Sequence, residues 1–180
     1  KDELDILLEQ MCSTYNRVKN SLKLYLDSDY NENAGNVARF SSIKNKTEAF
    51  GKMKQKMLEL CKKADDKKKE RSNELSRRIL EYIEDNFSYP NLSLQVMADN
   101  FGLNDVYMSR FFKKHIGENF STYLEKVRIK NATEMLKLQR YSVNTISQLV
   151  GYNSAMSFRR AFKRVMGTNP TDYKYENMKI

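Results

Sequence analysis

The chain has 180 residues, enough for one domain of ordinary size with an appendage. Its net charge is +9, and residues 91–180 carry most of it, with 14 Lys and Arg against 7 Asp and Glu, as expected of a surface that meets phosphates. The cysteines Cys12 and Cys61 give no disulfide framework, and there is no run of about 18 apolar residues, so we expect a cytoplasmic chain without a membrane span of its own.

The first helical pattern lies at Leu4–Tyr25, where apolar residues follow the 4-3 spacing of a coiled-coil seam. Its members are Leu4, Leu8, Met11, Tyr15, Val18, Leu22 and Tyr25. This seam must be buried, either against Phe50–Ala64 of the same chain or against the same helix of a second chain. The regular spacing favours a homodimer through Leu4–Tyr25. We expect Asp27–Lys46 to be a loop with at most one short helix, around Val37–Ile43.

A second helical pattern starts at Phe50 and is interrupted by the charged run Asp65–Arg71. We interpret this run as a solvated linker or helix surface rather than a nucleic-acid contact, and we expect the seam to break there. Ser72 or Asn73 then caps a new helix, which Pro90 prevents from continuing. The inward-facing residues of that helix are expected to be Leu75, Ile79, Ile83 and Phe87.

A helix-turn-helix pattern occurs twice, at Leu94–Gly117 and at Val143–Gly167. Each copy has a short apolar helix, a glycine suited to a left-handed turn, a polar cap, and a second helix with an apolar back and a cationic front. Four of the six glycines lie at the matched positions, which are Gly102, Gly117, Gly151 and Gly167. In the second copy, the residues expected to be buried are Val143, Ile146, Leu149, Val150, Phe158, Ala161, Phe162 and Val165.

The segment between the copies, Glu118–Leu138, is predicted to be one helix. Its apolar stripe consists of Phe120, Tyr123, Leu124, Val127, Ala132, Met135 and Leu136. A helix of about 19 residues spans roughly 28 Å. Half-sites on one face of B-DNA recur every ~34 Å. We therefore expect this helix to be a rigid spacer that holds two helices in successive major grooves.

Together these residues resemble the paired helix-turn-helix domain of the AraC/XylS transcription regulators. The resemblance covers roughly Ser72–Tyr175 and rests on LSLQVMADNFGL, SRFFKKHIG, the joining helix, SVNTISQLVGY, SFRRAFKRVMG and a closing G-x-x-P-x-x-Y, all in order. Ser147, Tyr152 and Lys174 depart mildly from the residues usual in that family. The resemblance implies an all-α, sequence-specific bacterial transcription regulator that binds double-stranded DNA and contacts RNA polymerase.

We accordingly predict a helical dimerising or signal-transmitting segment at 1–71, which lacks the strand pattern of the family's sugar-binding sensor. The AraC-type DNA-binding domain is predicted at 72–180, with helix-turn-helix units at 92–117 and 142–167 and the linker helix at 119–138. Because the chain begins at Lys1, it is also consistent with the end of a larger, membrane-anchored receptor.

The side chains expected to meet DNA lie on the outward faces of the second helix of each copy. They are Val106, Ser109, Arg110 and Lys113 in the first copy and Ala155, Met156, Arg159, Arg160 and Lys163 in the second. The resemblance implies base contacts for all of these except the two lysines, whose charge and position suit phosphates. Arginine reads guanine with two hydrogen bonds, whereas valine, alanine and methionine offer only apolar contact.

No residue constellation predicts an enzyme, a cofactor or a metal site. His115 is the only histidine and has no cysteine or histidine at metal-ligand spacing, and neither a G-x-x-x-x-G-K nor a G-x-G-x-x-G motif occurs. We expect Asp105 to interact with the start of its own helix rather than with a base. Two alternatives remain open from the residues alone: a helical protein-interaction scaffold, and an architectural DNA binder without sequence preference.

Overall fold

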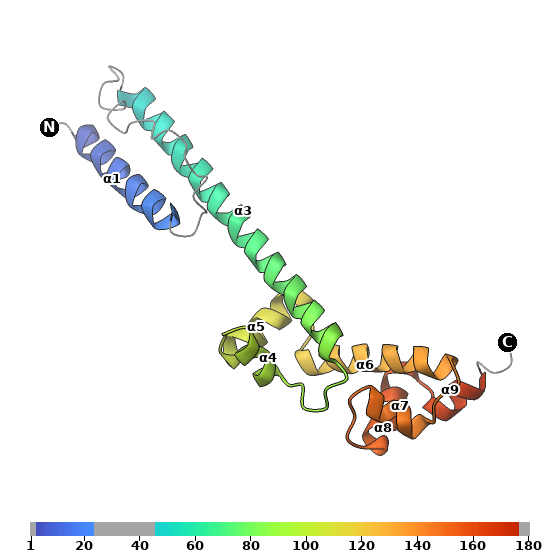
Figure 1. Cartoon of the computed structure of the whole chain (residues 1–180). Helices are drawn as coiled ribbons and strands as arrows, with labels where there is room; N and C mark the ends of the chain where they lie inside the picture. The colour runs from blue at the N-terminus through green and yellow to red at the C-terminus, as the bar shows by residue number, and fades with distance from the viewer. Residues whose placement is uncertain (1–2, 24–45, 177–180) are drawn as a thin grey trace. The chain divides into compact units, whose positions relative to one another are not determined.

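The computed structural model describes residues 3–23 and 46–176, and all regular structure in these ranges is helical (Figure 1). The helices are α1 (Glu3–Lys23), α3 (Lys46–Asn86), α4 (Leu94–Asn100), α5 (Asp105–Ile116), α6 (Phe120–Lys137), α7 (Val143–Leu149), α8 (Ala155–Met166) and α9 (Pro170–Glu176). The expected all-α fold is confirmed. The short helix predicted around Val37–Ile43, and Tyr25 at the end of the seam, lie outside the described residues.

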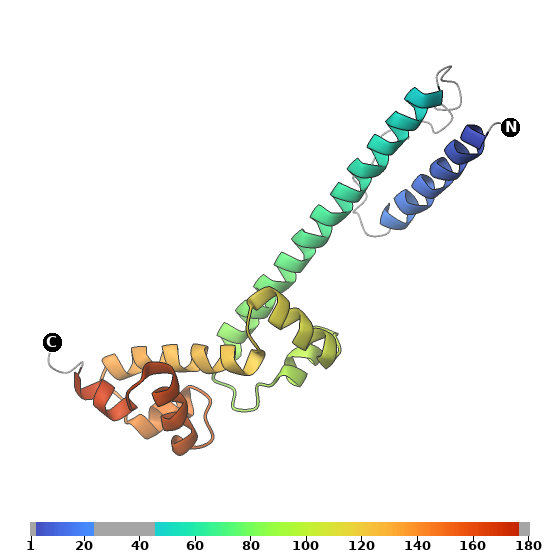
Figure 2. The ribbon, with the colours of Figure 1, turned by 180° about the vertical axis from the view of Figure 1, so that it is seen from behind.

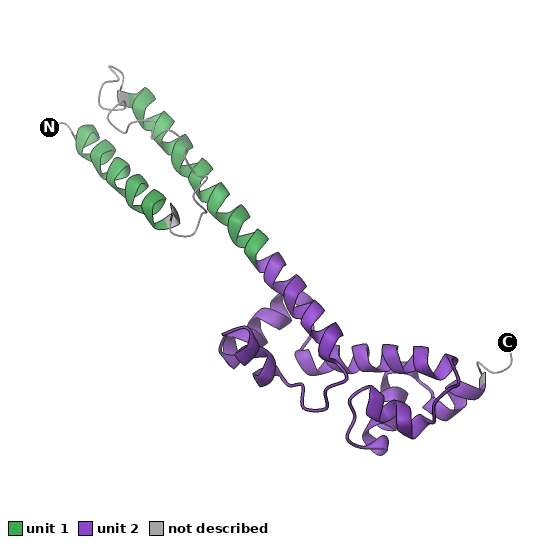
Figure 3. Cartoon of the chain, in the orientation of Figure 1, with its two compact units in different colours: residues 1–71 green, residues 72–180 purple. Residues whose placement is uncertain are grey.

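The chain divides into two compact units, residues 1–71 and residues 72–180 (Figure 3). The division falls inside α3, whose N-terminal part belongs to the first unit and whose last turns belong to the second. Among the described residues, no helix is both long and apolar enough to cross a membrane.

The prediction that a new helix starts at Ser72 or Asn73 is wrong, because α3 continues through Asp65–Arg71 without interruption. The run contains neither glycine nor proline, and lysine, glutamate and arginine are favourable helix residues. Lys67 and Glu70 also form an ion pair one turn apart, with 3.8 Å between Nζ and Oε2. The charged run therefore interrupts the apolar seam but not the backbone helix, and Ser72 and Asn73 lie in the helix interior.

In the first unit, α1 packs against the beginning of α3. Ala49 and Met53 are fully buried there. The residues of α1 packed against them are Leu8, Met11, Cys12 and Tyr15. Part of the predicted seam is thus covered by the same chain, which is one of the two burials that its spacing allowed.

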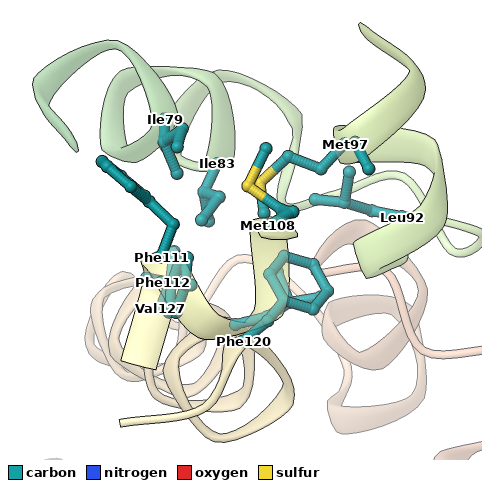
Figure 4. Packing of buried hydrophobic residues seen from close by; sticks show 11 residues of the cluster. Ile79, Ile83, Leu92, Met97, Met108, Phe111, Phe112, Phe120 and Val127 are labelled. Carbon is teal, nitrogen blue, oxygen red and sulfur yellow. The ribbon is translucent and has the colours of Figure 1, made fainter. Parts of the chain in front are cut away.

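The first core of the second unit joins the end of α3 to α4, α5 and the N-terminal half of α6. Its buried members include Ile79 and Ile83 from α3, Met97 from α4, and Met108, Phe111 and Phe112 from α5, closed by Phe120 and Val127 of α6 (Figure 4). The rings of Phe112 and Phe120 meet edge to face, with 5.9 Å between their centroids. The predicted inward face of α3 is therefore correct at Ile79 and Ile83.

The second core lies along the C-terminal half of α6, where α7, α8 and α9 gather (Figure 2). Its buried residues are Ile129, Ala132, Leu136, Ile146, Val150, Phe158, Ala161 and Phe162. Two residues predicted to be buried are not, since Leu149 is 41% exposed and Val165 is 37% exposed. Each lies in the last turn of its helix, and the neighbouring Val150 is fully buried in place of Leu149.

We expect Lys68→Pro to break α3, because proline removes a helical hydrogen bond and costs about 3 kcal/mol inside a helix. Lys68 is exposed, so no packing is lost directly. Hydrogen exchange should show faster exchange of the amides around residues 64–72, while those of α5 and α8 keep their protection. Lys68→Ala is the matched control and should leave exchange unchanged. Unchanged exchange in the proline variant would mean that the helix is already broken at this run.

Candidate functional site

The two copies of the repeated motif have the same local structure. Their first helices, α4 and α7, have 7 residues each, and their second helices, α5 and α8, have 12 residues each. Ser93 and Ser142 cap the first helices by accepting backbone N–H groups of Val96 and Thr145. Gly117 and Gly167 end the second helices in the left-handed conformation.

The turn within each copy is built on a glycine with positive φ, +64° at Gly102 and +84° at Gly151. In both turns this glycine and the next residue donate backbone hydrogen bonds into the last turn of the preceding helix; Leu103 N–H reaches Ala98 O at 2.9 Å, and Tyr152 N–H reaches Ser147 O at 2.9 Å. The second turn has one residue more before its cap, Asn153.

A polar cap then starts each second helix. The Asn104 side chain accepts from Tyr107 N–H at 2.7 Å, and the Ser154 hydroxyl accepts from Ser157 N–H at 3.4 Å. The Asp105 carboxylate accepts from Val106 N–H at 2.8 Å, so it interacts with its own helix end, where a negative charge is favourable.

The outward face of α5 carries the predicted residues of the first copy. Val106 is 56% exposed, and Ser109, Arg110 and Lys113 are exposed as well. Their spacing of three and four residues places them along one side of the helix. The opposite side is buried through Met108, Phe111 and Phe112. The structure therefore brings these four residues together on one accessible helix face.

The outward face of α8 is arranged in the same way but has a different composition. Met156 is 63% exposed, and Arg159, Arg160 and Lys163 are exposed, whereas Ala155 is half-buried at the start of the helix. The buried side consists of Phe158, Ala161 and Phe162. Three cations on this face, against two on α5, give α8 the stronger attraction for an anionic partner.

His115 stacks on Phe111, with 4.3 Å between the ring centroids, and its side chain is exposed. In the part of the chain that the structure describes, no three His, Cys, Asp or Glu side chains gather as metal ligands would.

The sequence reasoning missed a buried arginine in the middle of α6. Arg128 is 9% exposed and donates from Nε to Phe87 O and from Nη2 to Tyr89 O, both at 2.8 Å. Its guanidinium also lies over the Tyr152 ring, 5.4 Å from the centroid. The signal in the sequence was a charged residue between Val127 and Ile129, inside the apolar stripe of the joining helix.

A second unpredicted contact lies beside the first. Arg164 of α8 forms an ion pair and two hydrogen bonds with Glu125 of α6, one of them 2.9 Å from Nε to Oε1. Burial and the nearby Glu125 raise the pKa of Tyr152 to about 12, against the opposing effect of Arg128 and Arg164. The Tyr152 phenol therefore stays neutral at physiological pH, and Arg128 meets its aromatic face as a cation over a neutral ring.

Comparison with known proteins places the repeated motif among regulators of transcription. The family described as a helix-turn-helix domain matches residues 97–175. The transcriptional regulatory protein YesN of Bacillus subtilis is 32% identical over 100 residues, which are 54% of this chain and 27% of YesN. The arabinose operon regulatory protein of Escherichia coli is 26% identical over 98 residues, 54% of this chain and 34% of that protein. The chain thus covers about a third of the length of these relatives.

Among solved structures, the chain is similar to the C-terminal domain of AraT, a response regulator from Geobacillus stearothermophilus. The identity is 34%, the TM-score is 0.55, and the match covers 56% of this chain and 84% of that domain.

We expect Asn104→Ala to lower the free energy of unfolding by about 1 kcal/mol, because the N–H of Tyr107 loses its capping acceptor. Asn104→Asp is the matched control and should keep most of the stability, since aspartate caps helices as well as asparagine does. Chemical denaturation followed by circular dichroism measures both. Equal losses in the two variants would show that the amide matters for a reason other than capping.

Proposed function

Because this chain belongs to the AraC family of helix-turn-helix transcription regulators, we propose that α5 and α8 read two successive major grooves of double-stranded DNA. The family is non-enzymatic, and its members regulate transcription by sequence-specific DNA binding. The observation that carries the two-groove proposal is the duplication itself, because both copies present an exposed, partly cationic helix face opposite a buried aromatic one.

The joining helix supports this geometry. α6 has 18 residues. At 1.5 Å per residue a helix of this length spans roughly 27 Å. Successive major grooves on one face of B-DNA lie ~34 Å apart, so the length of α6 is of the same order as that separation. A folded spacer also avoids the loss of conformational freedom that a flexible linker suffers on binding.

We assign different roles to the exposed residues according to their chemistry. Arg110, Arg159 and Arg160 are proposed to read base edges, since a guanidinium donates two hydrogen bonds to guanine. Val106, Ala155 and Met156 are proposed to contact thymine methyl groups, and Ser109 to hydrogen-bond a base or a sugar-phosphate oxygen. Lys113 and Lys163 are proposed to contact phosphates, which fix the position of the helices without specifying sequence.

Residues 1–71 are proposed to transmit a signal to the DNA-binding units. The chain is proposed to act in the cytoplasm, and RNA polymerase is the second partner that the resemblance of residues 72–175 implies. AraT is a response regulator, so a regulatory input outside the helix-turn-helix units has a precedent in a similar protein.

We further propose self-association through α1. The seam residues Leu4, Met11 and Val18 are only half-buried, and Leu7, which flanks them, is 43% exposed. Leu58 on α3 is 62% exposed, so the same unit leaves apolar surface on both helices. A second copy of the unit would remove this surface from water.

The function is tested by selecting bound duplexes from a random pool with the whole chain. A two-groove reader enriches two short motifs at a fixed spacing. An architectural binder enriches no sequence, and a protein-interaction scaffold retains no DNA at moderate salt. Either of the last two results would contradict the proposal.

Arg160→Ala should weaken binding to the selected site by about 1–3 kcal/mol and relax the preference at one base pair. Lys163→Ala is the comparison: it should weaken binding to all sequences alike and reduce the salt slope by about 1. Fluorescence anisotropy on a panel of single-base variants, at several salt concentrations, separates the two. If Arg160→Ala behaves like Lys163→Ala, Arg160 contacts a phosphate instead.

Val18→Asp should dissociate the dimer in analytical ultracentrifugation, because it places a charge within the half-buried seam. Asn16→Asp, which adds the same charge at an exposed position off the seam, is the control and should stay associated. If the unmutated chain sediments as a monomer at tens of micromolar, the seam of α1 is buried only against α3 of the same chain, and the dimer proposal is wrong.

A further inference from the structure

We propose that Arg128 is a positioning residue that fixes the second DNA-reading helix relative to the first, so that it determines which half-site spacing the protein accepts. This inference rests on the proposed two-groove reading, and it concerns how the two copies are held together rather than which bases each copy contacts.

Arg128 connects three parts of the chain that are far apart in sequence. It belongs to α6, its two hydrogen bonds go to backbone carbonyls just beyond the end of α3, and its guanidinium covers the ring of Tyr152 in the turn of the second copy. Backbone carbonyls do not change rotamer, so two of them held at 2.8 Å fix the guanidinium plane.

Gly151 shows how closely the second turn approaches this contact. A Cβ atom added there would lie 2.7 Å from Phe87 O, 2.9 Å from Arg128 Nη2 and 3.0 Å from the Ser88 carbonyl carbon. The matched glycine of the first copy, Gly102, has nothing within 4 Å of such an atom. Both glycines have a positive φ, but only Gly151 lies this close to another segment of the chain.

The contact lies at the junction between the two cores. Val127 belongs to the first core and Ile129 to the second, so Arg128 separates them on α6. Phe87 packs against both cores. Glu125 of α6 and Arg164 of α8 form a further contact near Tyr152.

We call the contacts of Arg128 with Phe87, Tyr89 and the turn Gly151–Tyr152 the clamp. A clamp of this kind affects paired binding more than single binding. Each recognition helix keeps its own cap, core and outward face when the clamp is loosened, so its affinity for an isolated half-site should change little. Once one helix has bound its half-site, the other binds more readily if it already lies near the next groove. This gain in affinity depends on the relative position of the two helices, which the clamp holds.

The test compares Gly151→Ala with Gly102→Ala in binding to three duplexes: the selected site, the same site with one base pair inserted between its halves, and a single half-site. Both substitutions place alanine at positive φ, +64° at Gly102 and +84° at Gly151, and so cause backbone strain, but only Gly151→Ala disturbs the clamp. Arg128→Lys is a further variant, which keeps the charge but not the two fixed hydrogen bonds.

We expect Gly151→Ala and Arg128→Lys to bind the selected site about tenfold more weakly while binding the half-site as before. The inserted base pair should reduce the affinity of these two variants by a smaller factor than it reduces that of the unmutated protein. Gly102→Ala should keep the unmutated ratio of the affinities for the two spacings. If Gly151→Ala and Arg128→Lys keep that ratio, or lose equal affinity for all three duplexes, Arg128 only stabilises the fold and the proposal is wrong.

A measurement without DNA separates failure of the clamp from failure of the two-groove reading. Spin labels at Lys114→Cys on α5 and Met166→Cys on α8, in a chain with Cys12→Ala and Cys61→Ser, report the distance between the copies. A narrow distance distribution that broadens in Arg128→Lys and Gly151→Ala but not in Gly102→Ala supports the clamp even if no paired site is selected. An unchanged distribution in all three variants overturns it.

Discussion

Neither helix-turn-helix copy can bury its own apolar side chains, and both depend on α6 to do so. Each copy has one helix of 7 residues and one of 12. Isolated helices shorter than ~12–15 residues are marginal in water, so packing must hold these in place. The N-terminal half of α6 closes the first core and its C-terminal half closes the second. Because one helix serves both cores, the placement of the two outward faces is settled by packing rather than by the sequence of either copy.

The duplication conserves backbone structure but not surface chemistry. Caps, turn glycines and helix lengths agree between the copies, since each is required by the geometry of a short helix ending in a tight turn. The outward faces differ, with Ser109 in the first copy where the second has Arg159. The close approach at Gly151 has no counterpart at Gly102. The outward face can therefore differ between the copies without disturbing the fold.

The sequence was sufficient for features that depend on neighbouring residues. The polar cap of each second helix and the turn glycines were predicted because each works through bonds only a few residues long; the structure places the caps at Asn104 and Ser154. The error at Asp65–Arg71 arose because an interrupted apolar seam was taken for an interrupted helix, although the backbone depends on helix propensity and not on the seam. The exposure of Leu149 and Val165 depends on tertiary packing, which periodicity alone does not determine. Arg128 was missed because its hydrogen-bond partners lie 39 and 41 residues away in the sequence, and no local sequence pattern predicts contacts of that range.

The burial of Arg128 has a physical rationale in the end of α3. The last carbonyls of a helix lack partners within the helix and carry its negative dipole end, which a cation stabilises. α3 has no basic residue in its own last turn. Arg128 supplies a cation from α6 and donates hydrogen bonds to the carbonyls of Phe87 and Tyr89, in the segment where the chain leaves α3. Burial lowers the pKa of Arg128, which records the desolvation of its charge, and the carbonyls and the Tyr152 ring offset that desolvation. One arginine thereby holds the segment just after α3, separates the two cores and contacts the second turn, so a change in the backbone of that segment would reach the second copy through the same side chain.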